Sequence, residues 1–301
     1  MLREILLFLL SFFMMSAQAV TLENIGGGIY VHHGQHLDID SGYQGDICNL
    51  SVIVGSKGIA VIDTGGSLKV GQQLREAIKK ISDKPILYVI NTHVHPDHIY
   101  GNAAFLQDTP TFVGHQKLAN AMQIRQDAYK KLNEKYLGVD AVGTEMIFPT
   151  MQISGPTDIH LGDRVLTITP YETAHTNTDV TVFDQQTQTL LTGDLLFTER
   201  TPVVEGDIKG LIAVLEKLKN LPLKQIVPGH GKQTNDSQQA ISNELRYLNV
   251  VLADIRKVIK SGGSLSQAMD TAAQSEKNNW LLFDVANRRN INTIYPALEW
   301  E

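Results

Sequence analysis

Apolar positions along the chain follow two spacings, one typical of strands and one typical of helices. The runs "CNLSVIV" (48–54) and "GIAVID" (58–63) flank the turn "GSKG", which predicts a hairpin whose second strand leads into "DTGG". The segment 68–81 has apolar residues at helical spacing, and "ILYVI" (86–90) predicts a buried strand after it. The first half of the chain therefore predicts a β-hairpin, a helix and a further strand.

The second half of the chain repeats this order. The runs "DVTVFD" (179–184) and "TLLTGD" (189–194) predict another hairpin, followed by a helical pattern over 208–221 and by the strand "QIV" (225–227). Two halves of this kind indicate an internal duplication in an α+β fold, with two sheets that face each other and helices outside them. Because no linker rich in Pro or Ser interrupts residues 20–301, we expect a single domain.

Two further segments are predicted to be helical. The polar segment 123–144 is expected to form a helical insertion beside a pocket. The tail from Asn235 has helical periodicity over 241–259, and Ser264 is a candidate N-cap of the next helix.

The first nineteen residues differ from the rest of the chain. Arg3 precedes an apolar run over 5–15, and "AQA" (17–19) fits a cleavage site of small residues. The apolar run is too short for a membrane anchor, because crossing a bilayer needs about twenty residues. We therefore expect a signal peptide over residues 1–19 that is cleaved after Ala19. The mature protein is then expected in the periplasm or secreted, without insertion into the membrane.

Composition narrows the possible functions. The 301 residues are 43% hydrophobic and 19% charged, which is typical of a globular protein with a full core. The net charge is -6 and the chain has no long run of Lys or Arg, so we expect no nucleic-acid partner. Cys48 is the only cysteine, which excludes an internal disulfide and predicts the role of a small buried apolar residue.

The candidate chemistry is concentrated in "HVHPDH" (93–98), just after a predicted strand. His93 and His95 are two residues apart, so in extended backbone both side chains point the same way and can chelate one ion. Asp97 and His98 follow the turn and point elsewhere, which suits a second ion. Four donors on one short loop are more than a tetrahedral ion usually takes from a single loop. The motif therefore predicts a dinuclear metal site.

Three more candidate ligands stand where other predicted strands meet their loops. His175 lies in "ETAHTNTD", Asp194 ends "LLTGD", and His230 lies in "VPGHG". Such loops present side chains at one rim of a sheet. We therefore expect these three side chains to join the loop 93–98 around the same site.

Taken together, "DTGG" with Asp63, "HVHPDH", His175, Asp194 and "PGHG" resemble the metallo-β-lactamase superfamily, with glyoxalase II-like metal motifs. The resemblance implies a four-layer αββα sandwich with the metal site at one rim of the facing sheets. It also implies that Asp63 orients ligands rather than binding metal. The implied ligands are His93, His95 and His175 for the first metal, Asp97, His98 and His230 for the second, and Asp194 as a bridge between them.

The resemblance further implies a hydrolase that holds two zinc ions, with iron or manganese as alternatives. The expected reaction is attack on an ester-like bond (an ester, a thioester or a lactone) of a small acyl substrate. The nucleophile is expected to be a metal-bridging hydroxide, because a metal lowers the pKa of its bound water to about 7. Asp97 is the predicted catalytic residue. Asp194 disfavours β-lactamase activity, since the true β-lactamases of this fold lack a bridging aspartate there.

The C-terminal sequence "NRRNINTIYPALEWE" (287–301), together with export, most resembles the quinoprotein relay-system zinc metallohydrolases. That resemblance implies association with a periplasmic quinoprotein dehydrogenase. Three alternatives stay open: a periplasmic β-lactamase, a sulfur dioxygenase of the same fold with a single iron, and a non-catalytic metal-binding partner of the dehydrogenase.

Two arginines and several histidines outside these motifs have more than one interpretation. Arg288 or Arg289 could bind a substrate carboxylate, because a guanidinium fork suits a carboxylate, or could form an ion pair with the acidic tail. The remaining histidines are expected to lie in a polar loop or to make structural hydrogen bonds, with the first three as alternative lining of the site: His32, His33, His36, His115 and His160.

Overall fold

The computed structural model describes residues 19–40 and 42–301. The predicted signal peptide lies outside the described residues except for Ala19, so its cleavage stays a prediction. Within the described ranges, no helix combines the length and the apolar character that crossing a bilayer requires.

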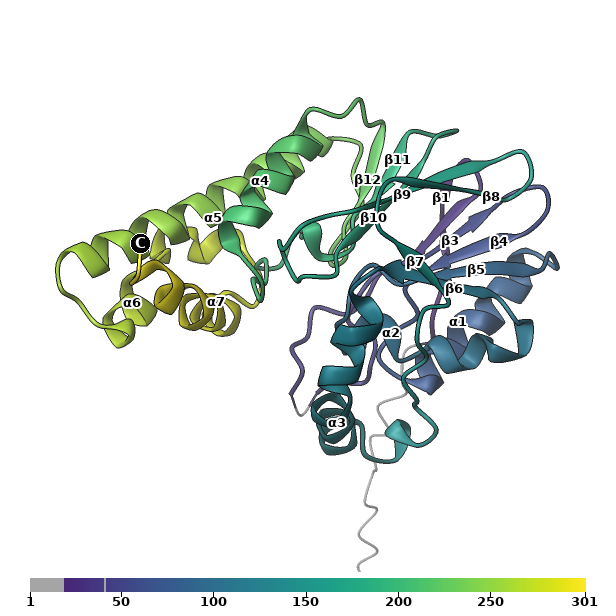
Figure 1. The fold of residues 1–301 in the computed structure, drawn as a ribbon, viewed down its shortest axis with the longest axis horizontal. Helices are drawn as coiled ribbons and strands as arrows, with labels where there is room; N and C mark the ends of the chain where they lie inside the picture. The colour runs from purple at the N-terminus through teal and green to yellow at the C-terminus, as the bar shows by residue number, and fades with distance from the viewer. Residues whose placement is uncertain (1–18, 41) are drawn as a thin grey trace, which may run out of the picture.

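Two β-sheets form the centre of the molecule (Figure 1). The first sheet has seven strands that lie in sequence order: β1 (Glu23–Gly26), β2 (Ile29–His32), β3 (Leu50–Val54), β4 (Ile59–Ile62), β5 (Ile86–Ile90), β6 (Thr111–His115) and β7 (Met151–Ile153). The second sheet has five strands in this order: β12 (Gln225–Val227), β11 (Thr189–Leu191), β10 (Val180–Asp184), β9 (Val165–Pro170) and β8 (Thr157–His160). Both predicted hairpins are confirmed, because β3 pairs antiparallel with β4 and β10 pairs antiparallel with β11.

Seven α-helices flank the sheets in the described part of the chain. They are α1 (Leu68–Ile81), α2 (Pro96–Ile99), α3 (Leu118–Leu137), α4 (Ile208–Lys219), α5 (Ser237–Lys260), α6 (Leu265–Thr271) and α7 (Phe283–Leu298). Four short 3-10 helices lie between them, at Asn102–Asp108, Gly138–Ala141, Gly193–Leu195 and Gln274–Asn279.

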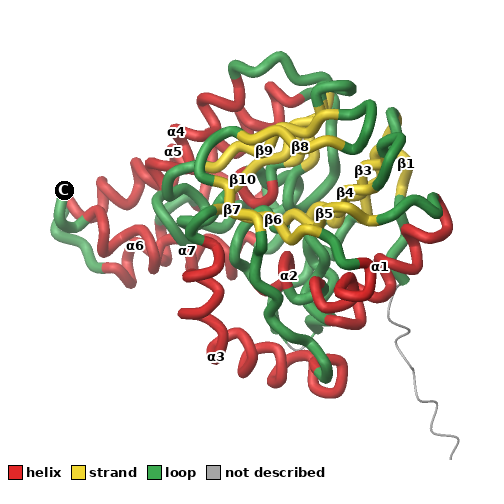
Figure 2. The backbone as a smooth tube through the Cα atoms, turned by 45° about the vertical axis from the view of Figure 1, so that its right-hand side comes forward, coloured by secondary structure: helices red, strands yellow, loops and turns green. Residues whose placement is uncertain are grey.

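The two sheets lie face to face (Figure 2), and hydrophobic side chains from both form one buried cluster. Ile53 of β3 and Ile90 of β5 share one buried cluster with Ile168 of β9 and Val182 of β10. Burying each such side chain stabilises the fold by about 1.5–3 kcal/mol. The other face of the first sheet packs against α1, and the other face of the second sheet packs against α4 and α5. The layers are therefore helix, sheet, sheet and helix, which confirms the predicted αββα sandwich.

The ends of two helices lie where local sequence predicts them. The side chain of Ser67 accepts a hydrogen bond from the first turn of α1, and Ser264 does the same for α6, as expected of N-caps. Helix α3 differs from the prediction: it begins at Leu118, five residues before the polar segment 123–144. The helix begins with residues that include the buried Leu118 and Met122, so the polar character that marks the segment 123–144 does not extend to this start.

The C-terminal helices α5, α6 and α7 pack on one another and on α4 around a shared apolar cluster. They project from one end of the sandwich, as Figure 1 shows. The tail that the sequence predicts to be helical is therefore helical, with a break at residues 261–264 between α5 and α6.

Candidate metal centre

All seven predicted ligands lie at one edge of the two sheets, and all except His95 are fully buried. Each stands in a loop or short helical turn at the end of a strand. The ligands are carried by the β5–α2 connection and α2 (His93, His95, Asp97, His98), the β9–β10 loop (His175), the turn after β11 (Asp194) and the turn after β12 (His230).

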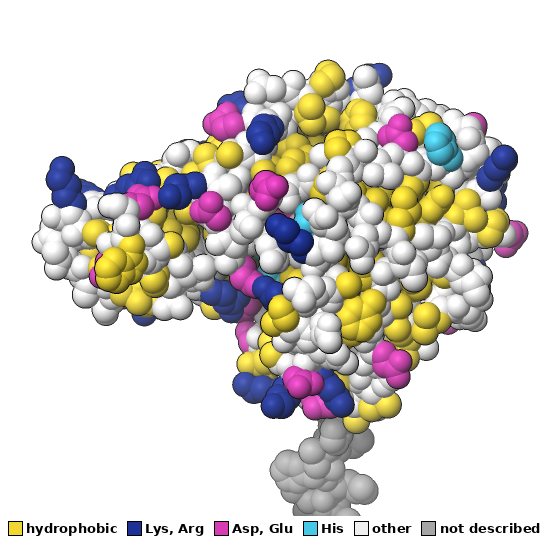
Figure 3. All heavy atoms as spheres, in the orientation of Figure 1, with side chains coloured by type: hydrophobic (Ala, Val, Ile, Leu, Met, Phe, Trp, Pro, Cys, Tyr) yellow, Lys and Arg dark blue, Asp and Glu magenta, His cyan; other side chains and the backbone are white. Residues whose placement is uncertain are grey.

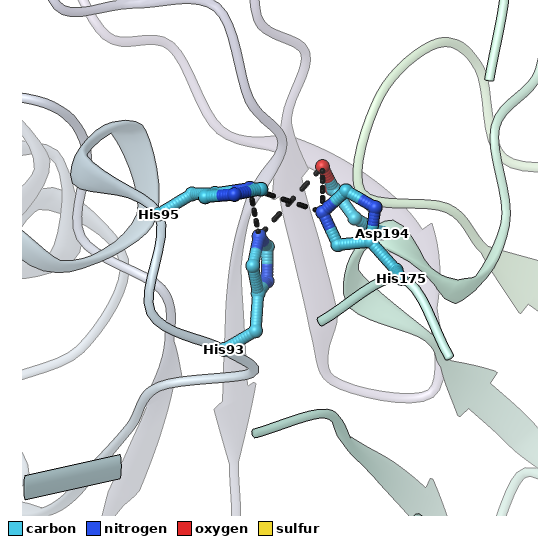
Figure 4. A group of neighbouring side chains, drawn as sticks. All are labelled: His93, His95, His175 and Asp194. Carbon is cyan, nitrogen blue, oxygen red and sulfur yellow. Dashed lines mark hydrogen bonds and ion pairs between the residues drawn. The ribbon is translucent and has the colours of Figure 1, made fainter. Parts of the chain in front are cut away.

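The first of two donor groups contains three imidazoles and one carboxylate (Figure 4). His95 Nδ1 lies 3.0 Å from His93 Nε2 and 3.0 Å from His175 Nε2. Asp194 Oδ2 completes the group, at 3.7 Å from His93 Nε2 and 3.4 Å from His175 Nε2. Four donor atoms from three separate loops therefore surround one point.

The second donor group shares Asp194 with the first. His98 Nε2 lies 3.3 Å from Asp194 Oδ1, and His230 Nε2 lies 3.2 Å from Asp194 Oδ2. Asp97 Oδ2 lies 3.4 Å from His98 Nε2 and 3.5 Å from His230 Nε2. Asp194 thus contacts both groups, as a bridging ligand must.

The outer nitrogens of the first group show where the imidazole hydrogens are. His175 Nδ1 lies 2.7 Å from the carbonyl oxygen of Val203, and His95 Nε2 lies 2.6 Å from the carboxylate of Glu205. Such oxygens only accept hydrogen bonds, so both outer nitrogens carry the hydrogen. The inner nitrogens of His95 and His175, 3.0 Å apart, then both present lone pairs. Two facing lone pairs repel each other, and a cation between them removes the repulsion.

The second group is held in the same way. His98 Nδ1 donates to Asp63 Oδ2 at 2.8 Å, and His230 Nδ1 donates to the carbonyl oxygen of Ile47 at 2.6 Å. In their neutral forms, both imidazoles therefore present the lone pair of the inner nitrogen to the acidic side chains between them. His98 Nε2 and Asp194 Oδ1 are buried and have no hydrogen-bond partner, which is costly unless another group satisfies them.

Asp63 orients two of the histidines, as the resemblance implies. Its Oδ1 accepts from Thr92 N at 2.8 Å, and its Oδ2 accepts from Thr92 Oγ1 at 2.7 Å and from His98 Nδ1 at 2.8 Å. Because the Thr92 hydroxyl donates to Asp63, its oxygen is free to accept from His93 Nδ1, 3.0 Å away. One carboxylate therefore fixes the orientation of an imidazole in each group.

The spacing and the charge of these donors fit divalent cations. Donors about 2.0–2.1 Å from a tetrahedral ion lie about 3.3 Å from one another, which falls within the 3.0–3.7 Å spread of the first group. Burial lowers the pKa of His93 well below its usual value and that of His175 to about 4, so both are neutral donors. Burial raises the pKa of Asp194, but the neighbouring His230 and His98 lower it well below its usual value, so Asp194 is an anion.

The second group attracts positive charge. Burial alone would lower the pKa of His98, yet the surrounding negative groups, Asp194 and Asp97 among them, raise it well above its usual value. The same interior that stabilises a proton on His98 would stabilise a metal ion. The donor set therefore fits two divalent cations that share Asp194.

The amino-acid sequence over most of the chain identifies its family. A family model described as "Metallo-beta-lactamase superfamily" matches residues 43–230, a range that contains all seven donors. The chain belongs to the metallo-beta-lactamase superfamily. The predicted resemblance is thereby confirmed at this level, and membership of the superfamily supports a metal-dependent hydrolase.

Solved structures of superfamily members share this fold at low sequence identity. The metallo-beta-lactamase from Pontibacter korlensis has a TM-score of 0.62 at 19% identity, covering 76% of this chain and 99% of that one. The stereoselective inverting sec-alkylsulfatase Pisa1 from Pseudomonas sp. has a TM-score of 0.71 at 15% identity, covering 92% of this chain and 50% of that one. At these identities the likeness shows the fold alone.

A curated relative is similar over a short stretch. The linear primary-alkylsulfatase of Pseudomonas sp. (strain ATCC 19151) is 40% identical over 57 residues, which are 19% of this chain and 11% of that protein. The match therefore spans only a small part of that relative's length.

A cavity of about 410 Å³ opens onto both donor groups of this superfamily member. His95, Asp97, Asp194 and His230 line it on the side of the donors. Helix α3 contributes Tyr129, Leu132 and Tyr136 to its wall, which confirms the prediction of a helical insertion beside a pocket. The charged residues that complete the lining are Asp38, Arg200, Glu205 and Arg289. Figure 3 shows basic, acidic and histidine side chains close together near the centre of one face.

The predicted ion pair between the arginines of α7 and the acidic tail is wrong. Arg289 pairs with Asp38 at 2.9 Å, and Arg288 pairs with Asp270 at 2.8 Å. Glu301 instead contacts basic residues of α4 and α5, because the end of the chain folds back onto those helices. Arg289 lines the cavity, but its charge is already matched by Asp38.

The histidines outside the site mostly have local partners, and the first three are not among the cavity lining. His32 Nε2 lies 2.7 Å from Asp46, and the half-buried His36 lies 3.3 Å from Glu199. His115 Nδ1 accepts from the backbone of Lys117 at 3.0 Å, a structural hydrogen bond as predicted. Cys48 is buried, as predicted, and its Sγ donates to the carbonyl oxygen of Asp97 at 2.9 Å.

Three residues near the site have no place in the sequence interpretation. Glu205 contacts His95 and also Arg125 of α3, at 3.0 Å. Arg200 lines the cavity beside His230, with its Nη1 3.2 Å from His230 Nδ1. Asn290 of α7 accepts from Val204 N at 2.9 Å and donates to Pro202 O at 2.7 Å, so it holds the segment whose Val203 carbonyl orients His175. Of the three, only Asn290 lies in a segment that the sequence singles out, "NRRNINTIYPALEWE" (287–301).

Proposed function

We propose that the protein is a dinuclear zinc hydrolase that cleaves an ester-like bond (an ester, a thioester or a lactone) of a small acyl substrate. The observation that carries this proposal is the orientation of the five imidazoles. Each points a lone pair inward because its outer nitrogen faces an acceptor, and Asp194 stands between the two groups. Zinc suits sites of nitrogen and oxygen donors with tetrahedral spacing, and iron or manganese are the alternatives.

When bound, the cations would supply water of lowered pKa and positive charge for the oxyanion that forms during acyl transfer. The chain's own residues would do the rest. His93, His95 and His175 would hold the first cation, and Asp97, His98 and His230 the second, with Asp194 contacting both. Asp97 is the proposed catalytic residue because it lines the cavity as well as the second donor group.

The proposal includes a location and a partner. The N-terminal sequence supports export to the periplasm, and the C-terminal sequence supports association with a quinoprotein dehydrogenase there. An acyl substrate small enough for a cavity of about 410 Å³ is of the size that such pockets usually take.

A second candidate substrate class is a sulfate ester. The 40% identity with a linear primary-alkylsulfatase over 57 residues supports it. The same two donor groups would serve either reaction, because both place negative charge on oxygen in the transition state.

The test is a substrate panel on the full chain purified with its metals. Metal analysis accompanies hydrolysis of 4-nitrophenyl esters, a thioester, a lactone, 4-nitrophenyl sulfate and a chromogenic β-lactam. We expect two zinc ions per chain and turnover of the acyl substrates. Turnover of the sulfate alone would favour the second candidate, and turnover of the β-lactam alone a β-lactamase. One iron per chain with thiol-dependent oxygen uptake would overturn the proposal in favour of a dioxygenase.

Asp97→Ala is the matched negative variant, and Asp270→Ala is its control because Asp270 is an exposed carboxylate that pairs with Arg288. We expect Asp97→Ala to abolish turnover and Asp270→Ala to keep it. The non-catalytic alternative would be supported if Asp97→Ala retained its metals and still served the dehydrogenase partner as well as the unchanged protein does.

A further inference from the structure

The segment 197–204 lies between the metal centre and helices α5 and α7. At its start, the ring of Phe197 is stacked on the imidazole of His230, with 5.2 Å between the ring centroids and 6° between the planes. The same ring meets His175 at a tilt, with 5.8 Å between the centroids. Near its end, the carbonyl oxygen of Val203 accepts from His175 Nδ1 at 2.7 Å. Both ends of this segment therefore contact imidazoles of the donor groups.

Buried polar side chains of α5 and α7 hold the two ends of the segment from the other side. Glu244 of α5 accepts from Phe197 N at 2.6 Å, and Asn290 of α7 accepts from Val204 N at 2.9 Å. Asn290 also donates to the hydroxyl of Tyr247, which lies three positions after Glu244 on α5, at 2.9 Å. All three side chains are fully buried, so solvent does not compete for these hydrogen bonds.

Glu244 is a buried carboxyl group with a single partner. Its hydrogen bond from Phe197 N is the only one that it makes among the described residues, and its Oε1 has no partner there. Burying a polar group without a partner costs free energy, and an apolar side chain of the same length would avoid that cost. Packing alone therefore does not account for a carboxyl group at this position, and what the carboxyl group adds is a fixed backbone at Phe197.

The backbone next to Phe197 is also tied to His230. Thr198 N donates to the carbonyl oxygen of His230 at 3.0 Å, and Phe197 pairs with His230 as an isolated parallel bridge. The face of the Phe197 ring and the backbone of Thr198 therefore both restrain His230. Losing the hydrogen bond between Phe197 N and Glu244 would loosen this ring and this backbone together.

We propose that Glu244 is a positioning residue for the second donor group and that it acts on His230 through Phe197. Asn290 is its counterpart at the first group, because it holds the segment whose carbonyl orients His175. This role rests on the proposed function, since it requires both donor groups to hold cations. Partners beyond the ligands fix the orientation of an imidazole and so its affinity for a metal.

Both anchors come from helices that follow the range 43–230 matched by the family model. Helices α5 and α7 thereby have a role at the metal centre besides the apolar packing that they share with α4. Each of the two helices acts mainly on a different donor group. Loss of one anchor should therefore weaken one zinc site more than the other.

The experiment is a competition titration of the metal-free full chain with zinc and a chromogenic chelator. Glu244→Met keeps the length of the side chain and removes the acceptor for Phe197 N. We expect its affinity for zinc to fall about threefold to tenfold at the second site, the size expected for one lost hydrogen bond, and less than about twofold at the first. His230→Ala, which empties mainly the second site, identifies the affinity that belongs to that site.

Two further variants separate the positioning of His230 from general stability. Glu244→Gln keeps an oxygen that can accept from Phe197 N, so it should bind both zinc ions as tightly as the unchanged protein does. Asp254→Ala is the matched control, because Asp254 is a carboxylate on the same helix that accepts from the backbone of Ala273 at 2.9 Å. It should lower the melting temperature, as Glu244→Met does, without changing the affinity for zinc.

The outcomes distinguish this role from the hydrolase proposal. Equal zinc affinities in Glu244→Met and the unchanged protein would overturn the role of Glu244, and so would an equal fall at both sites. A fall in Glu244→Gln as large as in Glu244→Met would also overturn it, because the acceptor is still present. If no substrate is cleaved while the zinc affinities change as expected, the hydrolase proposal fails and the role of Glu244 stands.

A second variant is needed in case Glu244→Met does not fold. Phe197→Leu keeps the backbone N–H that donates to Glu244 and removes the ring that is stacked on His230. The second zinc site should again weaken more than the first. Unchanged affinity at the second site would contradict a link through this ring.

Discussion

Glu205 allows a quantitative test of how the first donor group is held. Its Oε2 lies 2.6 Å from His95 Nε2, and its Oε1 lies 3.0 Å from Arg125 of α3. Although burial opposes the effect, the Glu205 carboxylate raises the pKa of His95, which shows how strongly it acts on this imidazole. Glu205→Gln keeps an oxygen that can accept from His95 Nε2 and removes only the negative charge.

The size of the effect follows from the contact and its exposure. A hydrogen bond to a charged group contributes about 1.5–3 kcal/mol, and a neutral one about 0.5–1.5 kcal/mol. The difference between the two is about 1 kcal/mol. Glu205 is 42% exposed, so solvent screens its charge and we expect a loss of no more than this value. Since about 1.4 kcal/mol corresponds to tenfold in affinity, we expect metal binding about threefold to fivefold weaker.

The assay is a competition titration of metal-free protein with zinc and a chromogenic chelator, which yields an affinity for each site. Only the site that contains His95 should weaken in Glu205→Gln. The matched control is Glu199→Gln: Glu199 is 39% exposed and contacts His36, which is not in a donor group. If Glu205→Gln binds both zinc ions as tightly as the unchanged protein, or if Glu199→Gln weakens them equally, the orienting role of Glu205 is refuted.

Other variants should separate the two groups and test a buried acid. Asp194→Ala should lower zinc content at both sites and His230→Ala mainly at the second; equal loss in both variants would contradict the assignment. Asn290→Ala should weaken only the first site in the same titration, because it releases the segment that orients His175. Burial raises the pKa of Glu244 well above 4.5, so stability should fall as pH rises above about 4.5, and thermal unfolding at pH 5 and pH 8 should show less of this fall in Glu244→Gln.

The sequence predicts most of the fold and the donors because their signals are local. Alternating apolar positions identify the two hairpins, and one short loop contains four of the donors. His175, Asp194 and His230 are predicted less directly, since each is a single polar residue at the end of a strand. They are predicted from their order along the chain relative to the other motifs. They meet in the structure because the strands that precede them end at the same edge of the sheets.

Contacts between side chains that are far apart in sequence cannot be predicted from local sequence patterns. His95 and Glu205 are 110 positions apart, and nothing near Glu205 marks it as different from other surface carboxylates. Arg200 is another example, because only the fold shows that this arginine is buried beside His230 and lines the cavity. Composition and periodicity identify the residue types, but they do not show which partners a side chain meets in the folded protein.

The way the histidines are held bears on which metals the site takes. Each group has one imidazole fixed by a backbone carbonyl, His175 in the first and His230 in the second. Each also has one fixed by a carboxylate, His95 by Glu205 and His98 by Asp63. A carboxylate partner makes the imidazole a stronger donor, so each group contains one imidazole strengthened in this way. Both groups are therefore prepared to hold a cation, whereas a site for a single iron would need only one of them.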